Sequence, residues 1–265
     1  MIKREPTVKR ALMAALVAVL LFCLWNVGLL EPSRLANGAR NIALFGRDLF
    51  PPDWGVLGTV AHALLETLQI AFAGTVLGFA IALPLSLLAS RLLFPAALAA
   101  AAKLVLAFIR TVPTLLWAII FVVAFGLGPA AGTLGVAFYT TGYLGKIFYE
   151  AYDAVDAEVL EAVRSVGCSR VQLARYALLP EAANILLAQA LFMFEYNVRA
   201  SAILGFVGAG GIGFYLLGYI QSLRYDRLMT ALLATLAVVI LIDRLSSWVR
   251  SMVLVPVQKR RRARA

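Results

Sequence analysis

Residues 161–180 read EAVRSVGCSRVQLARYALLP and form the one long, charged, amphipathic insertion between strongly apolar segments. Two short helices are predicted within it, one ending near Gly167 and the other opening at Ser169. Ser169 and Gln172 have the spacing of a capping box, in which each side chain bonds the other residue's backbone N–H. With its charged side chains facing water, this helix-turn-helix is expected to lie flat on a membrane surface, where another protein can bind it.

The composition is that of a multi-pass membrane protein. Of the 265 residues, 62% are hydrophobic and only 14% are charged, against roughly 45–50% apolar residues in soluble proteins. The net charge of +10 comes from basic residues at the ends of apolar runs and in the tail QKRRRARA. Positive-inside topology and contact with anionic lipid explain this charge better than nucleic-acid binding does.

Six apolar runs are expected to cross the membrane as helices, at about residues 11–30, 64–90, 114–125, 133–149, 182–206 and 228–245. The polar segment 31–61 is expected to be an external loop with a surface helix, and the Ala-rich segment 94–109 a tilted or interfacial entry. The bias of arginine and lysine places both termini and the 161–180 loop in the cytoplasm. The predicted fold is therefore all-α and polytopic.

A glycine-rich segment follows the fifth apolar run. Gly208, Gly210 and Gly213 satisfy the G-x-G-x-x-G pattern, which binds a pyrophosphate when it follows a strand in a βαβ unit. Here it follows a predicted membrane helix, so we interpret it as a break that is buried or lines a cavity. Gly208, Gly210 and Gly211 are candidates for a solute path, with a tight helix-packing turn as the alternative.

Other signatures of catalysis are weak in this sequence. Gly145-Lys146 is not a P-loop, because Thr140 and Ile147 stand where that motif needs Gly and Ser or Thr. One histidine and two distant cysteines give no metal-ligand spacing, and no Ser/His/Asp set can be assembled. A membrane-embedded enzyme is therefore disfavoured, and no metal site is expected.

Three polar residues lie inside the fifth apolar run, namely Glu195, Asn197 and Arg199. A charge at the centre of a membrane helix costs at least about 2.5–3.5 kcal/mol, so these side chains should face protein or water. Glu195 and Arg199 are four residues apart and can pair on one helical face. They are either a structural ion pair or part of the path of a charged solute. Asp243 is expected to be an interfacial anchor.

The 161–180 loop resembles the EAA loop of the permease subunits of bacterial ATP-binding-cassette (ABC) importers, whose pattern is E-A-A, three residues, Gly, nine residues, then I-x-L-P. The matching residues are Glu161, Ala162, Gly167, Leu179 and Pro180. Val163 and Ala177 depart from the pattern by small apolar replacements. The resemblance implies that the loop contacts an ATPase through Glu161, Ala162, Gly167, Cys168, Ser169, Arg170, Leu179 and Pro180.

The resemblance extends over roughly residues 59–251, and its finer features are similar to the phosphonate and phosphite permease family. These features are the segments RTVPTLLWAIIFV, GLGPAAG, TGYLGKIFYEA and EYNVRASAILGFVGAGGIGF. The family implies a type I-like importer fold with an N-terminal anchor and external loop (1–58), a permease core (59–251) whose coupling loop is 150–180, and a basic cytoplasmic tail (252–265).

The same resemblance implies a multi-pass protein of the bacterial inner membrane that pairs with a second copy of itself. Its further partners would be a cytoplasmic ABC ATPase dimer, an extracytoplasmic solute-binding protein and membrane lipid, and not nucleic acid. The chain would hold no cofactor, since the partner ATPase binds ATP and Mg²⁺. Alternating access would carry phosphonate, phosphite or phosphate past Arg199. Methionine or an alkanesulfonate is the alternative cargo, and a structural membrane scaffold the alternative role.

Overall fold

The computed structural model describes residues 6–253, and every regular element in that range is a helix. The chain forms two units, Met1–Pro51 and Pro52–Ala265. The boundary between them falls within the predicted external loop. The predicted basic tail, beyond residue 253, lies outside the described residues.

The first unit consists of two helices, α1 (Pro6–Asn26) and α2 (Pro32–Asp48). Residues Val8–Asn26 of α1 are long and apolar enough to cross a membrane. Helix α2 begins with a proline in its first turn, where the missing N–H costs nothing. It buries no residue, as expected for a surface helix within the polar segment.

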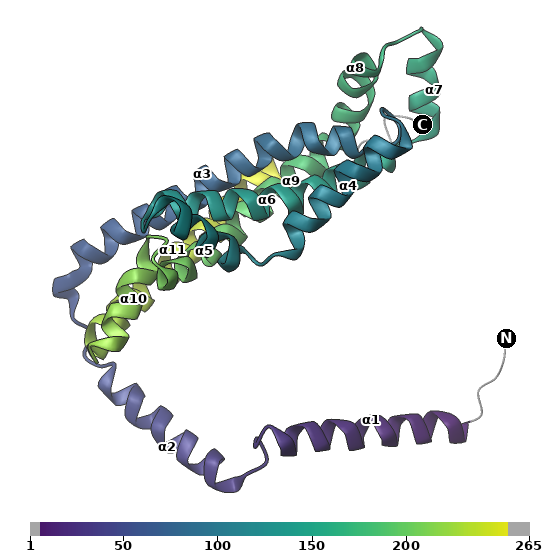
Figure 1. The fold of residues 1–265 in the computed structure, drawn as a ribbon. Helices are drawn as coiled ribbons and strands as arrows, with labels where there is room; N and C mark the ends of the chain where they lie inside the picture. Colours follow the sequence, from purple (N-terminus) through teal and green to yellow (C-terminus); the bar gives the residue numbers. More distant parts are fainter. Residues whose placement is uncertain (1–5, 254–265) are drawn as a thin grey trace. The chain divides into compact units, whose positions relative to one another are not determined.

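The second unit is a bundle of helices that is entered through a short 3-10 turn (Trp54–Val56). In chain order its helices are α3 (Leu57–Ala89), α4 (Ala96–Thr111), α5 (Thr114–Phe125), α6 (Pro129–Asp153), α7 (Ala157–Ser165), α8 (Arg170–Leu173), α9 (Leu179–Leu204), α10 (Ile212–Gln221) and α11 (Tyr225–Val253). A π turn (Ala174–Leu178) joins α8 to α9, and a 3-10 turn (Gly205–Val207) ends α9. Helices α7 and α8 lie at one end of the bundle and α10 at the other (Figure 1).

The prediction that residues 114–125 cross the membrane by themselves is wrong. Helix α5 has 12 residues, which is about 18 Å of helix against a hydrocarbon core of about 30 Å. It forms a pair with α4 that is bent by 89° at residues 112 and 113. Proline at position 113 disfavours helical geometry in the residue before it, and the indole N–H of Trp117 donates to the Ile109 carbonyl across the bend at 3.0 Å.

Helix α6 is the centre of the second unit, although it is not among the described helices that are apolar enough to cross a membrane by themselves. It packs against α3, α4, α5 and α9. Small residues make the α3 contact close, because a Cβ atom added at Gly78 would lie 2.6 Å from the Thr140 Cβ. The small-residue face that the spacing of Gly74, Gly78 and Ala82 predicts is therefore the packing face of α3.

Candidate functional site

The hairpin of α7 and α8 has the local structure that its sequence predicts. Gly167 adopts a positive φ of 74°, and its N–H donates to the Arg164 carbonyl at 2.9 Å, so it ends α7 as a C-terminal glycine commonly does. The Ser169 hydroxyl accepts from the Gln172 N–H at 3.3 Å, and the Ser169 N–H donates to the Gln172 side chain at 2.8 Å. The predicted capping box is confirmed.

The hairpin has an apolar inner side and an open outer side. Leu160, Leu173 and Leu178 are buried in a cluster with Phe148 and Tyr152 of α6. On the outer side the hairpin has a hollow of about 440 Å³ lined by Ala162, Val163, Val166, Gly167, Cys168, Gln172 and Tyr176. The side chain of Val166 is 83% exposed beside this hollow. An exposed apolar rim around a hollow is what a partner protein can bury.

The second helix of the hairpin does not end within the loop, which differs from the prediction of two separate short helices. From α8 the chain continues through the π turn into α9, and Arg170–Val207 is one continuous helical stretch of 38 residues. Pro180 lies in the first turn of α9, and because proline has no N–H, the wider π turn before it accommodates the missing bond. Helices α8 and α9 therefore form one continuous helical path from the hairpin into the bundle.

Asn197 lies in the interior, at the meeting point of three helices. Its side-chain N–H donates to the Thr75 hydroxyl of α3 at 2.8 Å and to the Thr140 hydroxyl of α6 at 2.9 Å. The side chain is fully buried, and its carbonyl oxygen has no partner among the described residues. Asn197 therefore fixes helix packing near the middle of α6.

The predicted pairing of Glu195 with Arg199 is wrong. Arg199 pairs with Asp243 of α11 at 3.0 Å, and Glu195 pairs with Arg250 of α11 at 2.8 Å. Both ion pairs join α9 to α11, which run antiparallel and bring distant charges together. Asp243, which was expected to be an interfacial anchor, instead holds the guanidinium of the candidate path residue.

Arg199 also lines a cavity of about 320 Å³ between α9 and the α4–α5 bend. The lining residues are Pro113, Thr114, Leu115, Tyr196, Arg199, Ala200, Ile203 and Leu204. Arg199 is the one charged residue among them. Tyr196, Arg199 and Ile203 are exposed, so this hollow opens on the surface of the chain. Along α9 it lies at the level of Asn197, which binds the middle of α6.

The glycine-rich break after α9 is a packed turn. Gly208, Gly210 and Gly211 all have positive φ. The Gly211 N–H donates to the Glu66 carboxylate at 3.1 Å, and the Ile212 N–H donates to the Thr67 hydroxyl at 2.8 Å. No strand precedes the break within residues 6–253. The geometry thus corresponds to the helix-packing alternative, at the end of α3 remote from the hairpin.

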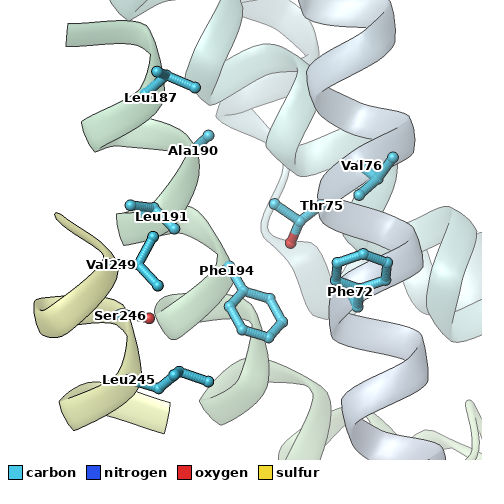
Figure 2. A pocket seen from close by; sticks show the side chains of 10 residues that line it. All are labelled: Phe72, Thr75, Val76, Leu187, Ala190, Leu191, Phe194, Leu245, Ser246 and Val249. Atoms are coloured by element: carbon cyan, nitrogen blue, oxygen red, sulfur yellow. The ribbon is translucent and has the colours of Figure 1, made fainter. Parts of the chain in front are cut away.

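A second hollow, of about 360 Å³, lies between α3, α9 and α11. Figure 2 shows its lining side chains, which are Phe72, Thr75, Val76, Leu187, Ala190, Leu191, Phe194, Leu245, Ser246 and Val249. The lining is almost entirely carbon, with Thr75 and Ser246 as its polar residues. This hollow suits an apolar chain and not a charged solute. Among residues 6–253, no three His, Cys, Asp or Glu side chains group as metal ligands would.

The chain has relatives among known proteins. Residues 74–253 match the family described as the inner membrane component of binding-protein-dependent transport systems. The chain belongs to this family. It is thus the permease subunit of an ABC importer, a multi-pass protein of the inner membrane.

Two similar permeases and one solved structure illustrate the relationship. The permease is 36% identical to the phosphite transport system permease protein PtxC of Stutzerimonas stutzeri, over 89% of this chain and 86% of that one. It is 37% identical to the phosphate-import permease protein PhnE of Mycolicibacterium smegmatis, over 80% of this chain and 40% of that one. A structure of the inward-facing MetNI methionine ABC transporter is similar with a TM-score of 0.65, at 25% identity, over 77% of this chain and all of that one.

Sequence reasoning missed the partners of the candidate site residues. Glu66 and Thr67, which hold the glycine break, stand 145 residues before it in the chain. Thr114, at the wall of the Arg199 cavity, was read only as the start of a span. Asp243 carried an indication, because a carboxylate near the end of the last apolar run can still require a partner.

Proposed function

We propose that this permease carries a phosphorus oxyanion, either phosphonate, phosphite or phosphate, across the inner membrane. The observation that carries the proposal is Arg199, a cation that lines an open hollow between α9 and the α4–α5 bend. A guanidinium offers paired N–H donors that match the oxygens of such an anion. The similarity to permeases named for phosphite and phosphate supports the same class of solute.

The hairpin of α7 and α8 is the proposed surface for a cytoplasmic ATPase dimer. Its outer side exposes apolar and charged residues, among them Glu161, Val166 and Arg170. Because α8 is continuous with α9, a partner that closes on the hairpin moves the helix that carries Arg199. The ATPase would bind ATP and Mg²⁺, this chain would hold no cofactor of its own, and both termini would be cytoplasmic.

The working unit would contain two permease chains, with a second copy of this chain as the proposed partner. An extracytoplasmic binding protein would deliver the solute at the end of the bundle opposite the hairpin, where α10 lies (Figure 1). Rocking of the two bundles would then expose the cavity to each side in turn.

Uptake of labelled phosphite, methylphosphonate and phosphate into vesicles that hold the complete complex tests the solute. We expect ATP-dependent uptake of at least one of them, and competition by the others. Uptake of methionine without any oxyanion uptake would establish the alternative cargo, which the likeness to the MetNI structure favours.

Coupling is tested by Glu161→Lys, with Asp48→Lys on the exposed helix α2 as a matched charge reversal outside the loop. We expect the first variant to insert normally but to lose stimulated ATP hydrolysis and uptake, while the second retains both. Wild-type uptake by the Glu161→Lys protein would contradict the coupling role and would favour a scaffold.

A further inference from the structure

The Arg199 cavity has the elements of an anion site beyond the guanidinium itself. The first turn of α5 forms part of its wall. The first backbone bonds of α5 run from the N–H groups of Leu116 and Trp117 to the Pro113 carbonyl. The preceding N–H groups, of Thr114 and Leu115, belong to the positive end of the helix and lack intrahelical partners.

Thr114 adds a second, independent polar group. It is 8% exposed, it lines the cavity, and its hydroxyl makes no hydrogen bond with the described residues. The fully buried side-chain atoms without a partner do not include the Thr114 oxygen, so this hydroxyl is accessible and can donate to a ligand in the cavity. The wall therefore combines a cation, helix N–H groups and a hydroxyl donor, and none of the lining residues is acidic.

Arg199 is not free when the cavity is empty, because Asp243 binds it. Its Nη1 atom lies 3.0 Å from the Asp243 Oδ1 atom, and the side chains are 45% and 47% exposed. Only the Nη1 atom of Arg199 is bonded to Asp243, so the guanidinium keeps further N–H donors for a second anion on the cavity side. Asp243 does not line the cavity, so its carboxylate approaches the guanidinium from outside it.

The other ion pair between α9 and α11 is less exposed and has no residue in the cavity wall. The side chain of Glu195 is only 14% exposed, and its carboxylate accepts from Arg250 at 2.8 Å. Neither residue lines the Arg199 cavity. This pair can hold the two helices together while the Arg199 pair opens.

We infer that Asp243 is an exchangeable counter-ion, and this inference rests on the proposed function. Its carboxylate pairs with the Arg199 guanidinium until a phosphorus oxyanion displaces it. The oxyanion binds Arg199, the Thr114 hydroxyl and the N-terminus of α5, and Asp243 is released from the guanidinium. When the solute leaves, Asp243 returns to the guanidinium and favours release. The carboxylate thus sets how tightly the path holds its cargo.

The test measures equilibrium binding of labelled phosphate, up to millimolar concentration, to the purified complex in nanodiscs without the binding protein. Phosphite and methylphosphonate serve as competitors. We expect Asp243→Asn to bind about 10-fold more tightly than wild type, and Arg199→Gln about 10- to 100-fold more weakly, from the loss of a charge-assisted bond. In the double variant, Asp243→Asn should give no gain, because its competitor role requires Arg199.

Arg250→Gln is the matched control, since it removes the other α9–α11 ion pair and leaves the cavity lining intact. We expect unchanged phosphate affinity in this variant. Weakened binding by Asp243→Asn would mean that the Asp243 pair is structural and would overturn the inference, as would equal losses in Arg250→Gln and Arg199→Gln. Absence of binding by both the wild type and Asp243→Asn would also overturn it.

These outcomes separate the inference from the proposed function. Oxyanion uptake by wild-type vesicles, together with unchanged affinity in Asp243→Asn, would leave the function standing and remove only the exchange. Absence of oxyanion uptake by wild type would refute the function itself.

Discussion

Two glycine turns flank the continuous helix Arg170–Val207, and they use a positive φ for opposite purposes. Gly167, before the helix, has a positive φ, and no atom lies within 4 Å of where its Cβ would be. Gly211, after the helix, has a positive φ of 78°, and its added Cβ would lie 2.7 Å from the Thr67 hydroxyl. The first glycine permits a turn in open space, whereas the second permits a close approach between distant segments. The turn that faces the proposed ATPase can adapt, and the remote turn is fixed.

The largest effect is expected for Gly211→Ala. The change combines a backbone conformation that is essentially restricted to glycine (φ 78°, ψ −169°) with overpacking against Thr67, so the free energy of unfolding should fall by about 2–5 kcal/mol. The denaturation midpoint of the purified protein in detergent measures it. Gly218→Ala is the control, since Gly218 lies inside α10 with no atom within 4 Å of an added Cβ, and it should keep or raise stability.

Thr67→Val should have the next largest effect. The Thr67 hydroxyl accepts from the Ile212 N–H at 2.8 Å in a buried place, so valine leaves that N–H without a partner and lowers stability by about 1–3 kcal/mol. Thr67→Ser keeps the hydroxyl and should recover most of the loss. Equal stability of the valine and serine variants would show that the bond does not hold the glycine turn.

Gly167→Ala tests the open turn. Only the backbone conformation opposes alanine there, so stability should fall by about 1–2 kcal/mol. Gly167→Asn should lose less, because asparagine tolerates the left-handed region. A loss as large as that of Gly211→Ala would remove the distinction between an open and a packed turn.

Ser169→Ala should have the smallest effect, a local one of about 1 kcal/mol, because it removes the N-cap acceptor of α8. Hydrogen exchange at residues 170–173 should accelerate about 5-fold, the factor that corresponds to this energy. Ser169→Asp retains an acceptor and should exchange as wild type does. Unchanged exchange in the alanine variant would mean that the capping box does not stabilise α8.

The sequence predicted the open turn well and the packed turn poorly, for a physical reason. The geometry of the open turn depends on residues that are at most three positions apart. The capping box of Ser169 and Gln172 and the break at Gly167 can therefore be predicted from the local sequence. The partners of the glycine break and of Arg199 stand 145 and 44 residues away. Local spacing suggested a bond between Glu195 and Arg199, but the antiparallel helix α11 offers each of them a partner across the helix contact.

Hydropathy predicted the positions of the helices more reliably than the way in which they cross the membrane. The Ala-rich segment and the next apolar run both became helices, yet the bend at Pro113 joins them into one pair. The hairpin helix α8 was expected to end in the loop, but the π turn carries it into α9. Bends and continuities of this kind depend on tertiary packing, which no short window of sequence contains.

The central position of α6 has a consequence for biogenesis. This helix carries Lys146 and Glu150 as an ion pair at 3.3 Å, and its buried residues include many glycines and threonines beside Leu144, Phe148 and Tyr152. A segment of this composition partitions weakly into lipid when it leaves the translocon alone. Its insertion therefore depends on helices that precede it, with α3 and α5 supplying the surfaces it packs against. The order of synthesis, which places both before α6, provides those surfaces in time.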